Sequence, residues 1–161
     1  MPETTILAQT AVLRNHKTIV IASSPTGWIN RIALTIIYCW FGVFKIIHQS
    51  PAQELVANLH SVTFVHYIPI NIFQVMLGYS ECIIGILWLV PRLTKTAFTI
   101  FSLHIITTFL PLFFLPDQTW SNTLILTMSG QYIMKNLVLV ASALTVFYDY
   151  KKTKNSINTA A

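Results

Sequence analysis

The chain has 161 residues, of which 54% are hydrophobic and only 9% are charged. Soluble domains carry about 25% charged residues, so this composition excludes an ordinary soluble protein and favours lipid as the solvent. The formal net charge is +5, but the basic residues lie between and beyond long apolar blocks and form no nucleic-acid-binding motif. We therefore expect a membrane protein whose partner is the lipid bilayer, and no nucleic-acid partner.

The N-terminal segment, residues 1–27, contains only short apolar runs, which Arg14, His16 and Lys17 interrupt. A cleavable signal peptide needs a longer uninterrupted apolar region, so we expect none here. The segment is predicted to precede the first membrane helix on the cytoplasmic side.

Four later stretches approach the roughly 20 apolar residues that a membrane-spanning helix needs. Between the first two, Ser50, Pro51 and Glu54 suit an N-cap, a first helical position and a first turn, so residues 51–62 predict a short interfacial helix. A turn is expected at 91–95, a loop at 116–129 and a basic tail at 151–161. The fold class is therefore an all-α membrane protein, with a 28–150 domain of four transmembrane helices at about 28–48, 71–90, 96–115 and 131–150.

The basic residues indicate the orientation of these helices. Eight of the ten lysines and arginines fall on one side of the predicted topology: Arg14, Lys17, Arg31, Arg92, Lys95, Lys151, Lys152 and Lys154. The positive-inside rule places this side, and both termini, in the cytoplasm.

Each predicted helix carries an ionisable side chain inside the membrane, where such a residue is costly and normally faces a partner: Lys45, Glu81, His104 and Lys135. Arg31 shares a helical stripe with Lys45, separated by steps of three and four residues. The helical rise places Glu81 and His104 near the midplane, and both lysines roughly 8–10 Å toward the outer side. We expect a buried charge cluster in which Glu81 meets Lys45, Lys135 or both.

Two interpretations of this cluster remain open. Buried ion pairs can serve only to specify which helices pack together. Alternatively, the cluster binds an anionic or quinone-like head group, or relays protons. A second pair, Cys39 and Cys82, lies near the midplane of adjacent helices and is either a redox pair or packing residues. The histidines have no metal-ligand spacing, and the two cysteines form no CxxC pair, so no metal site is predicted.

The same residues carry a family resemblance. Residues 40–45 (WFGVFK), 78–85 (GYSECIIG), 107–111 (TTFLP) and 129–136 (SGQYIMKN) follow one another as in the DoxX-like superfamily of small four-helix membrane proteins. The chain most resembles the YkgB-type branch of reactive chlorine resistance proteins. The resemblance implies a four-helix bundle in the bacterial inner membrane, a link to redox or thiol stress, and functional positions at Arg31, Lys45, Glu81 and Lys135.

Three functions follow as expectations. The first is an accessory factor in redox or oxidative (reactive chlorine) stress defence that binds a quinone or small oxidised species, or serves as the membrane subunit of an oxidoreductase. The second is a non-catalytic structural or assembly subunit of a membrane complex, and the third is a small-molecule or proton transporter. The expected protein partners are further copies of the chain or membrane oxidoreductase subunits. The sequence shows no nucleotide loop, catalytic triad or metal motif, so we do not expect an autonomous enzyme.

Overall fold

A computed structural model describes residues 24–63 and 68–159. Four of its helical segments are long and apolar enough to cross a membrane: Pro25–Ile46, Ile70–Trp88, Pro91–Phe114 and Met128–Ser156. The predicted all-α bundle of four spans is thus confirmed, and the chain is a multi-pass membrane protein. The expectations for Arg14, Lys17 and a signal peptide lie outside the described residues.

The first span is helix α2, Pro25–Ile46, which begins earlier than predicted because Ser24 and Pro25 supply a start signal. The Ser24 hydroxyl accepts a hydrogen bond from the Gly27 amide, and proline needs no amide partner at the first helical position. The helix ends where His48 adopts a left-handed backbone with φ of 56°. The Gln49 amide there bonds back to the Phe44 carbonyl, a Schellman-type ending.

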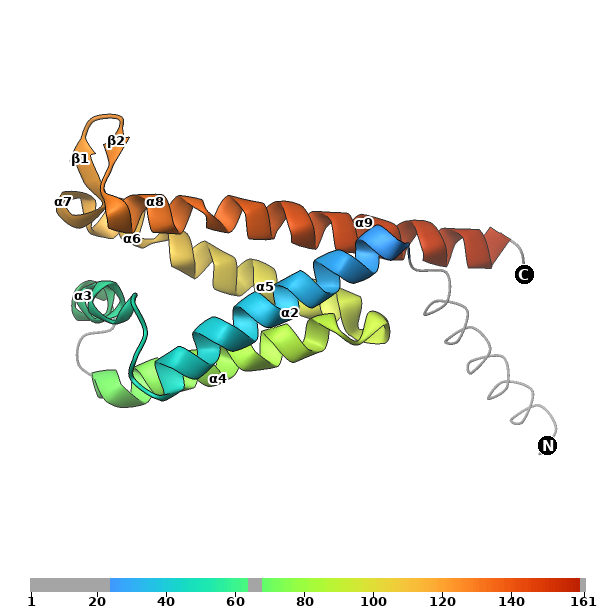
Figure 1. The fold of residues 1–161 in the computed structure, drawn as a ribbon, viewed down its shortest axis with the longest axis horizontal. Helices are drawn as coiled ribbons and strands as arrows, with labels where there is room; N and C mark the ends of the chain where they lie inside the picture. The colour runs from blue at the N-terminus through green and yellow to red at the C-terminus, as the bar shows by residue number, and fades with distance from the viewer. Residues whose placement is uncertain (1–23, 64–67, 160–161) are drawn as a thin grey trace.

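The predicted interfacial helix exists as α3, Gln53–Thr63, and the second span is α4, Ile70–Trp88. Figure 1 shows α3 end-on at one end of the bundle, lying across the long helices rather than along them. We call this the α3 end of the molecule. Helices α2 and α4 lie side by side, and their separation from α8 and α9 grows toward the α3 end, where α3 lies between the two pairs.

The third and fourth spans are each broken. After a short turn, η1 (Pro91–Leu93), the third consists of α5, Thr94–Phe109, and α6, Pro111–Phe114, interrupted at Pro111 as proline requires. The fourth consists of α8, Met128–Met134, and α9, Asn136–Thr159.

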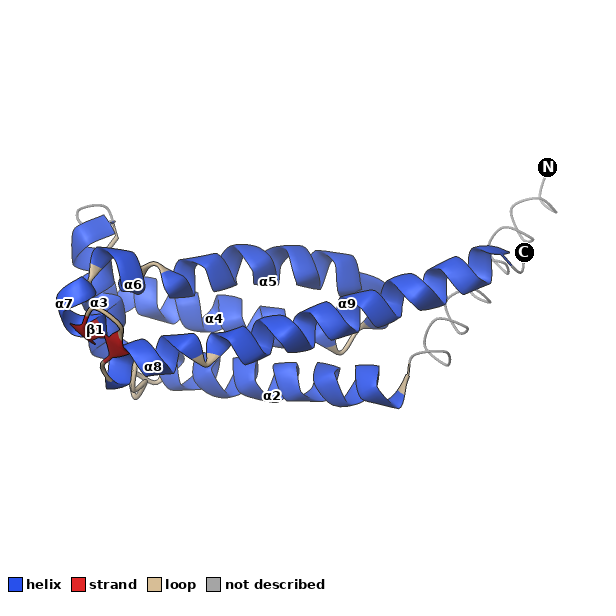
Figure 2. Ribbon diagram, turned by 90° about the horizontal axis from the view of Figure 1, so that it is seen from above, coloured by secondary structure: helices blue, strands red, loops and turns tan. Residues whose placement is uncertain are grey.

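Two segments outside the predicted spans also differ from the sequence prediction. The expected loop at 116–129 contains a helical turn, α7 (Pro116–Thr119), and an antiparallel hairpin of β1 (Trp120–Asn122) and β2 (Ile125–Leu126), the only strands in the described chain. Figure 2 shows them at the α3 end. The expected tail is helical, because no glycine or proline follows Gly130 to stop α9 before Thr159.

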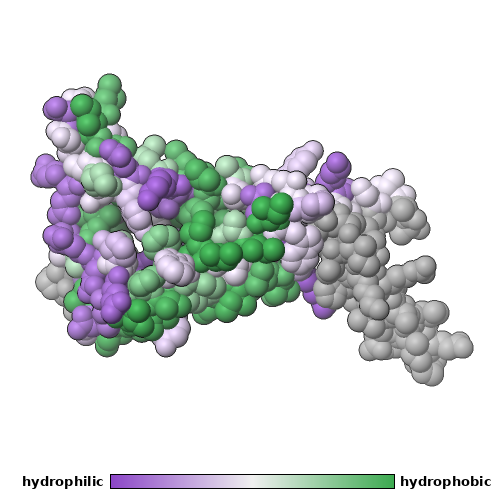
Figure 3. Space-filling model, viewed as in Figure 1, coloured by the Kyte–Doolittle hydropathy of each residue, from purple (hydrophilic) through white to green (hydrophobic). Residues whose placement is uncertain are grey.

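The packed core occupies the half of the bundle away from α3. Its largest fully buried apolar side chains, Trp88, Phe101 and Leu34, come from three different helices. The outward faces of the spans are apolar, with Ile36, Trp40 and Met76 each more than half exposed. Figure 3 shows apolar surface along the bundle and hydrophilic side chains gathered at the α3 end. An outer surface of this kind suits contact with lipid.

Glycines allow the backbones of α2 and α4 to touch. A Cβ atom built on Gly42 would lie 2.6 Å from the Gly78 carbonyl oxygen, and one on Gly78 would lie 2.6 Å from the Gly42 carbonyl oxygen. No other side chain fits in that space, which is the role that small residues play between membrane helices. The face of α4 that carries Gly78 and Gly85 therefore packs on α2 and fixes the positions of the polar residues nearby.

Candidate functional site

An ion pair joins α2 to α4 in the half of the bundle nearer α3. The Lys45 ammonium lies 2.7 Å from Glu81 Oε1 and 2.6 Å from Oε2, so it contacts both carboxylate oxygens. The two side chains are only 9% and 8% exposed. Lys45 and Gly42 are three residues apart on one helix, as are Glu81 and Gly78 on the other, so the close glycine contact brings the two charges together.

A third helix brings His104 to the same carboxylate. Its Nε2 atom lies 3.2 Å from Glu81 Oε1, and its side chain is 7% exposed. The contact lacks the alignment of a hydrogen bond, so neither ring nitrogen has a hydrogen-bond partner among the described residues. The ring packs edge-on against Tyr38, with 5.6 Å between the centroids. His104 is thus a buried polar group whose hydrogen-bonding capacity is unused.

Lys135 lies on the fourth span, at the break between α8 and α9. Its ammonium sits over the Tyr132 ring, 4.4 Å from the centroid, and it makes no ion pair with any described residue. Of the two partners expected for Glu81, the structure therefore pairs it with Lys45 and leaves Lys135 apart. The break is held by the Asn136 amide, which donates a 3.2 Å hydrogen bond to the Thr108 hydroxyl of α5.

The four ionisable residues predicted inside the membrane all line one cavity of about 700 Å³ at the α3 end of the bundle: Lys45, Glu81, His104 and Lys135. Helices α2, α3, α4, α5 and α9 all contribute to its walls, and Leu55, Leu59, Leu77 and Leu139 are typical of its mostly apolar lining. Small-molecule sites commonly measure about 300–1,000 Å³ and combine apolar walls with a few polar groups. Its polar lining comprises Tyr38, Lys45, His60, Thr63, Glu81, His104, Thr107, Thr108, Tyr132, Lys135 and Asn136.

Arg31 does not belong to this cluster, although it shares a helical stripe with Lys45. Its guanidinium donates to the Trp88 carbonyl at 2.9 Å and to the Thr94 hydroxyl at 2.8 Å, where α4 turns into α5. The side chain is buried, and it lies at the far end of α2 from Lys45. A shared stripe shows that two residues lie on the same face of a helix, but not that they lie at the same position along the helix axis. Arg31 and Lys45 therefore share a face and have different partners.

The two cysteines face each other across the α2–α4 contact. Each thiol lies 3.9 Å from the backbone carbonyl of the other cysteine, and both are free. A Cβ on Gly85 would lie 2.8 Å from Cys39 Sγ, so this thiol fills the space beside a glycine. Neither cysteine lines the cavity. Their position fits small packing residues, one of the two interpretations that the sequence left open.

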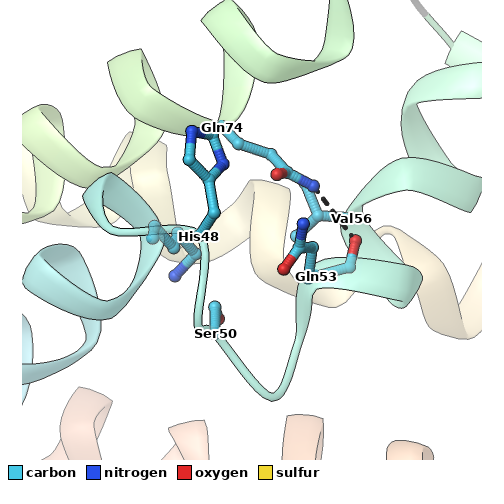
Figure 4. A pocket seen from close by; sticks show the side chains of 6 residues that line it. His48, Ser50, Gln53, Val56 and Gln74 are labelled. Carbon is cyan, nitrogen blue, oxygen red and sulfur yellow. Dashed lines mark hydrogen bonds between the residues drawn. The ribbon is translucent and has the colours of Figure 1, made fainter.

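Polar residues also surround Lys45 on its other side, toward the end of the bundle. His48, Ser50, Gln53 and Gln74 line a small pocket beside it, and the Gln74 amide donates to the Gln53 carbonyl at 3.2 Å (Figure 4). This contact ties α3 to α4 next to the ion pair. The sequence analysis did not single out Gln74, although a glutamine buried within an apolar helix is a signal that could have identified it.

His60 and Tyr132 also lie at the site without having been predicted there. His60, on α3, is buried, and its Nε2 atom lies 3.1 Å from the Ile68 carbonyl oxygen. Tyr132 packs edge-on against Phe41 of α2, with 5.8 Å between the ring centroids. His60 falls within the interfacial helix predicted for residues 51–62, but the sequence does not show that this helix lines the cavity.

Comparisons of the chain with protein families, with curated proteins and with solved structures find no match.

Proposed function

We propose that this membrane protein binds a small lipophilic molecule of the quinone class, or a comparably small oxidised species, in the cavity beside Glu81. The observation that carries the proposal is an apolar cavity of about 700 Å³ with Lys45, Glu81 and His104 in its wall. Apolar walls suit a ring and its substituents, and the few polar groups can orient a head group.

The chemistry of these polar groups favours a carbonyl-bearing ligand. A lysine ammonium has three hydrogens, and Glu81 occupies at most two of them through its two oxygens. His104 has no hydrogen-bond partner among the described residues. A quinone offers carbonyl oxygens that accept hydrogen bonds, so it would satisfy a buried donor whose isolation is otherwise costly.

The physiological role that we propose is an accessory factor in redox or oxidative (reactive chlorine) stress defence, in a bacterial inner membrane with both termini cytoplasmic. This part of the proposal rests on the DoxX-like resemblance of residues 40–45, 78–85, 107–111 and 129–136. Because the sequence carries no nucleotide loop or metal motif, we propose an accessory or membrane-subunit role within an oxidoreductase or homo-oligomer rather than autonomous catalysis.

A binding measurement tests the proposal. The purified protein in mild detergent is titrated with a short-chain ubiquinone analogue and followed by tryptophan fluorescence. We expect saturable binding that weakens roughly tenfold in His104→Phe, which is about 1.4 kcal/mol of binding free energy. Leu103→Ala is the matched control. Leu103 precedes His104 in the chain, but its own side chain points outward and is 64% exposed. Absence of saturable binding to the wild-type protein would refute the proposed function.

One observation favours a second candidate, a purely structural role for the charges. The Lys45–Glu81 pair directly bridges the two helices whose backbones meet at Gly42 and Gly78. Under this interpretation, Lys45→Met and Glu81→Gln each reduce the yield of folded protein, since each leaves a buried group without its partner. The double variant restores folding, and quinone binding is absent from the wild type as well as from the variants.

A further inference from the structure

The formal charges that face the cavity do not balance. Five lining residues can carry charge near neutrality: Lys45, His60, Glu81, His104 and Lys135. Lys45 and Glu81 neutralise each other through their bidentate contact. No other acidic residue lines the cavity, and Lys135 makes no ion pair in the part of the chain that the structure describes. Apart from the two histidines, the lining therefore carries one positive charge in excess.

The excess charge lies on the fourth span, at an exposed residue that also lines the cavity. Lys135 follows Met128, where the fourth span begins, by seven residues, or about 10 Å of helix. The Asn136–Thr108 hydrogen bond fixes the helix break beside it against α5. The Tyr132 ring stabilises the ammonium only partly, because a cation–π contact does not neutralise its charge. An ammonium in this place favours an anion within the same cavity.

A second donor faces the same space. The His104 side chain is 7% exposed, lines the cavity and uses neither ring nitrogen in a hydrogen bond among the described residues. Glu81 already neutralises the Lys45 ammonium, so an anionic ligand oxygen finds a cation without an acidic partner in Lys135 and a further donor in His104. One of them is neutral and the other is a cation, which together suit a head group that has one anionic oxygen and neighbouring carbonyl groups.

We propose that the cavity selects a ligand with a single negative charge on its head group, of the acidic hydroxyquinone class, and that Lys135 neutralises this charge. The inference rests on the proposed function, since it names the charge of the molecule that would fill the same cavity.

Two probes of nearly equal size separate charge from shape. The first, 2-hydroxy-1,4-naphthoquinone, is ionised at neutral pH, and its 2-methoxy ether is neutral. We expect the wild-type protein to bind the ionised probe roughly tenfold more tightly than the ether. The preference should disappear in a wild-type titration at a pH low enough to protonate the hydroxyl, a result that does not depend on any variant folding.

Variants then assign the preference to one residue. Lys135→Gln should remove it and leave ether binding within about twofold of the wild-type value, whereas Lys135→Arg should retain it. Lys151→Gln is the matched control, because Lys151 also sits over an aromatic ring, 5.0 Å from the Phe147 centroid, but outside the cavity. Circular dichroism and gel filtration verify that each variant is folded.

The outcomes distinguish the two proposals. If the ether and the ionised probe bind the wild-type protein equally well, the anionic selectivity is wrong while the quinone cavity stands. If the preference survives in Lys135→Gln, another group supplies the charge and the assignment to Lys135 is wrong. If neither probe binds, the proposed function fails and the inference fails with it.

Discussion

Two buried cations on α2 are stabilised in different ways. Arg31 distributes its guanidinium over a backbone carbonyl and a hydroxyl, which a planar group with several donors can do. Lys45 places its ammonium on a single carboxylate. The first arrangement holds the turn between α4 and α5 through hydrogen bonds to uncharged groups, while the second places a charged pair in the wall of a cavity. Their different surroundings predict different effects of mutation.

Replacing Arg31 with lysine should lower stability without changing the cavity. A lysine cannot make both hydrogen bonds in the geometry of the guanidinium, so either the Trp88 carbonyl or the Thr94 hydroxyl loses its bond to this residue. We expect a loss of about 1–3 kcal/mol in unfolding free energy, measured by denaturant titration in detergent. Arg92→Lys, at an exposed position of the same turn, is the control. Impaired quinone binding with unchanged stability would instead link Arg31 to the site.

The sequence specified the faces of the site residues better than their partners. Helical spacing placed Lys45 on a stripe of α2 that is buried in the structure. The same spacing also included Arg31, because periodicity says nothing of depth. The choice between Lys45 and Lys135 as the partner of Glu81 depends on the glycine contact of α2 with α4, which is a tertiary feature that neither helix shows alone.

At the scale of the helices, the contact of α2 with α4 fixes the site. Gly42→Ala would place a methyl group 2.6 Å from the Gly78 carbonyl and 2.7 Å from Cys82 Sγ, so the helices must separate. We expect a loss of about 1–3 kcal/mol in unfolding free energy, as for overpacking elsewhere, together with weaker quinone binding. Val43→Ala, on the outward face of α2 and 48% exposed, should change neither property. An unchanged melting temperature for Gly42→Ala would show that the helices are not in tight contact.

The two broken helices illustrate what sequence signals reveal about an element. Pro111 indicates the break in the third span, because proline has no backbone amide hydrogen to continue the hydrogen bonds of the helix. The break at Lys135 has no such signal, since neither glycine nor proline lies at this point of the fourth span. It coincides with the hydrogen bond from Asn136 to Thr108 of another helix. Breaks of this second kind require knowledge of the neighbouring helix.

Filling the cavity from α4 tests whether its volume matters. Leu77 lines the cavity and Met76 next to it is 56% exposed on the outward face. We expect Leu77→Trp to abolish quinone binding, because the indole occupies space that the ligand needs. Met76→Trp adds the same group on the lipid side and should leave the affinity for the quinone unchanged. Equilibrium dialysis measures the affinity here, because the added tryptophan would alter the fluorescence signal. Equal affinities in the two variants would place the ligand elsewhere on the protein.

Over the whole molecule, the tightly packed core lies toward one end of the bundle and the cavity lies toward the other. The buried cluster around Trp88 and Phe101 closes the bundle at one end. Toward the α3 end, α2 and α4 separate from α8 (Figure 1), and side chains of α3 such as Leu55 and Leu59 line the cavity. The lengths of the apolar blocks predicted the four spans. The spacing between the helices also depends on where small residues let two helices approach, as Gly42 and Gly78 do. It therefore became visible only in three dimensions.

The four spans also predict the side on which each loop lies. An even number of crossings puts the start of α2 and the end of α9 on the same side, and Figure 1 shows both at the end opposite α3. Of the described basic residues, Arg31, Arg92, Lys95, Lys151, Lys152 and Lys154 gather toward this end. The positive-inside rule then predicts that this end is cytoplasmic, and that the cavity and α3 lie toward the opposite side of the membrane.

Reporter fusions in bacterial cells measure this orientation. Alkaline phosphatase folds only outside the cytoplasm, so a fusion after Asn122 in the hairpin should be active and one after Leu93 inactive. A fluorescent protein that matures only in the cytoplasm should fluoresce when joined to the C-terminus and stay dark when joined after Asn122. The paired reporters control for expression at each site. The opposite pattern would place the basic end outside the cytoplasm, and any ligand would then reach the cavity from the cytoplasmic half of the membrane.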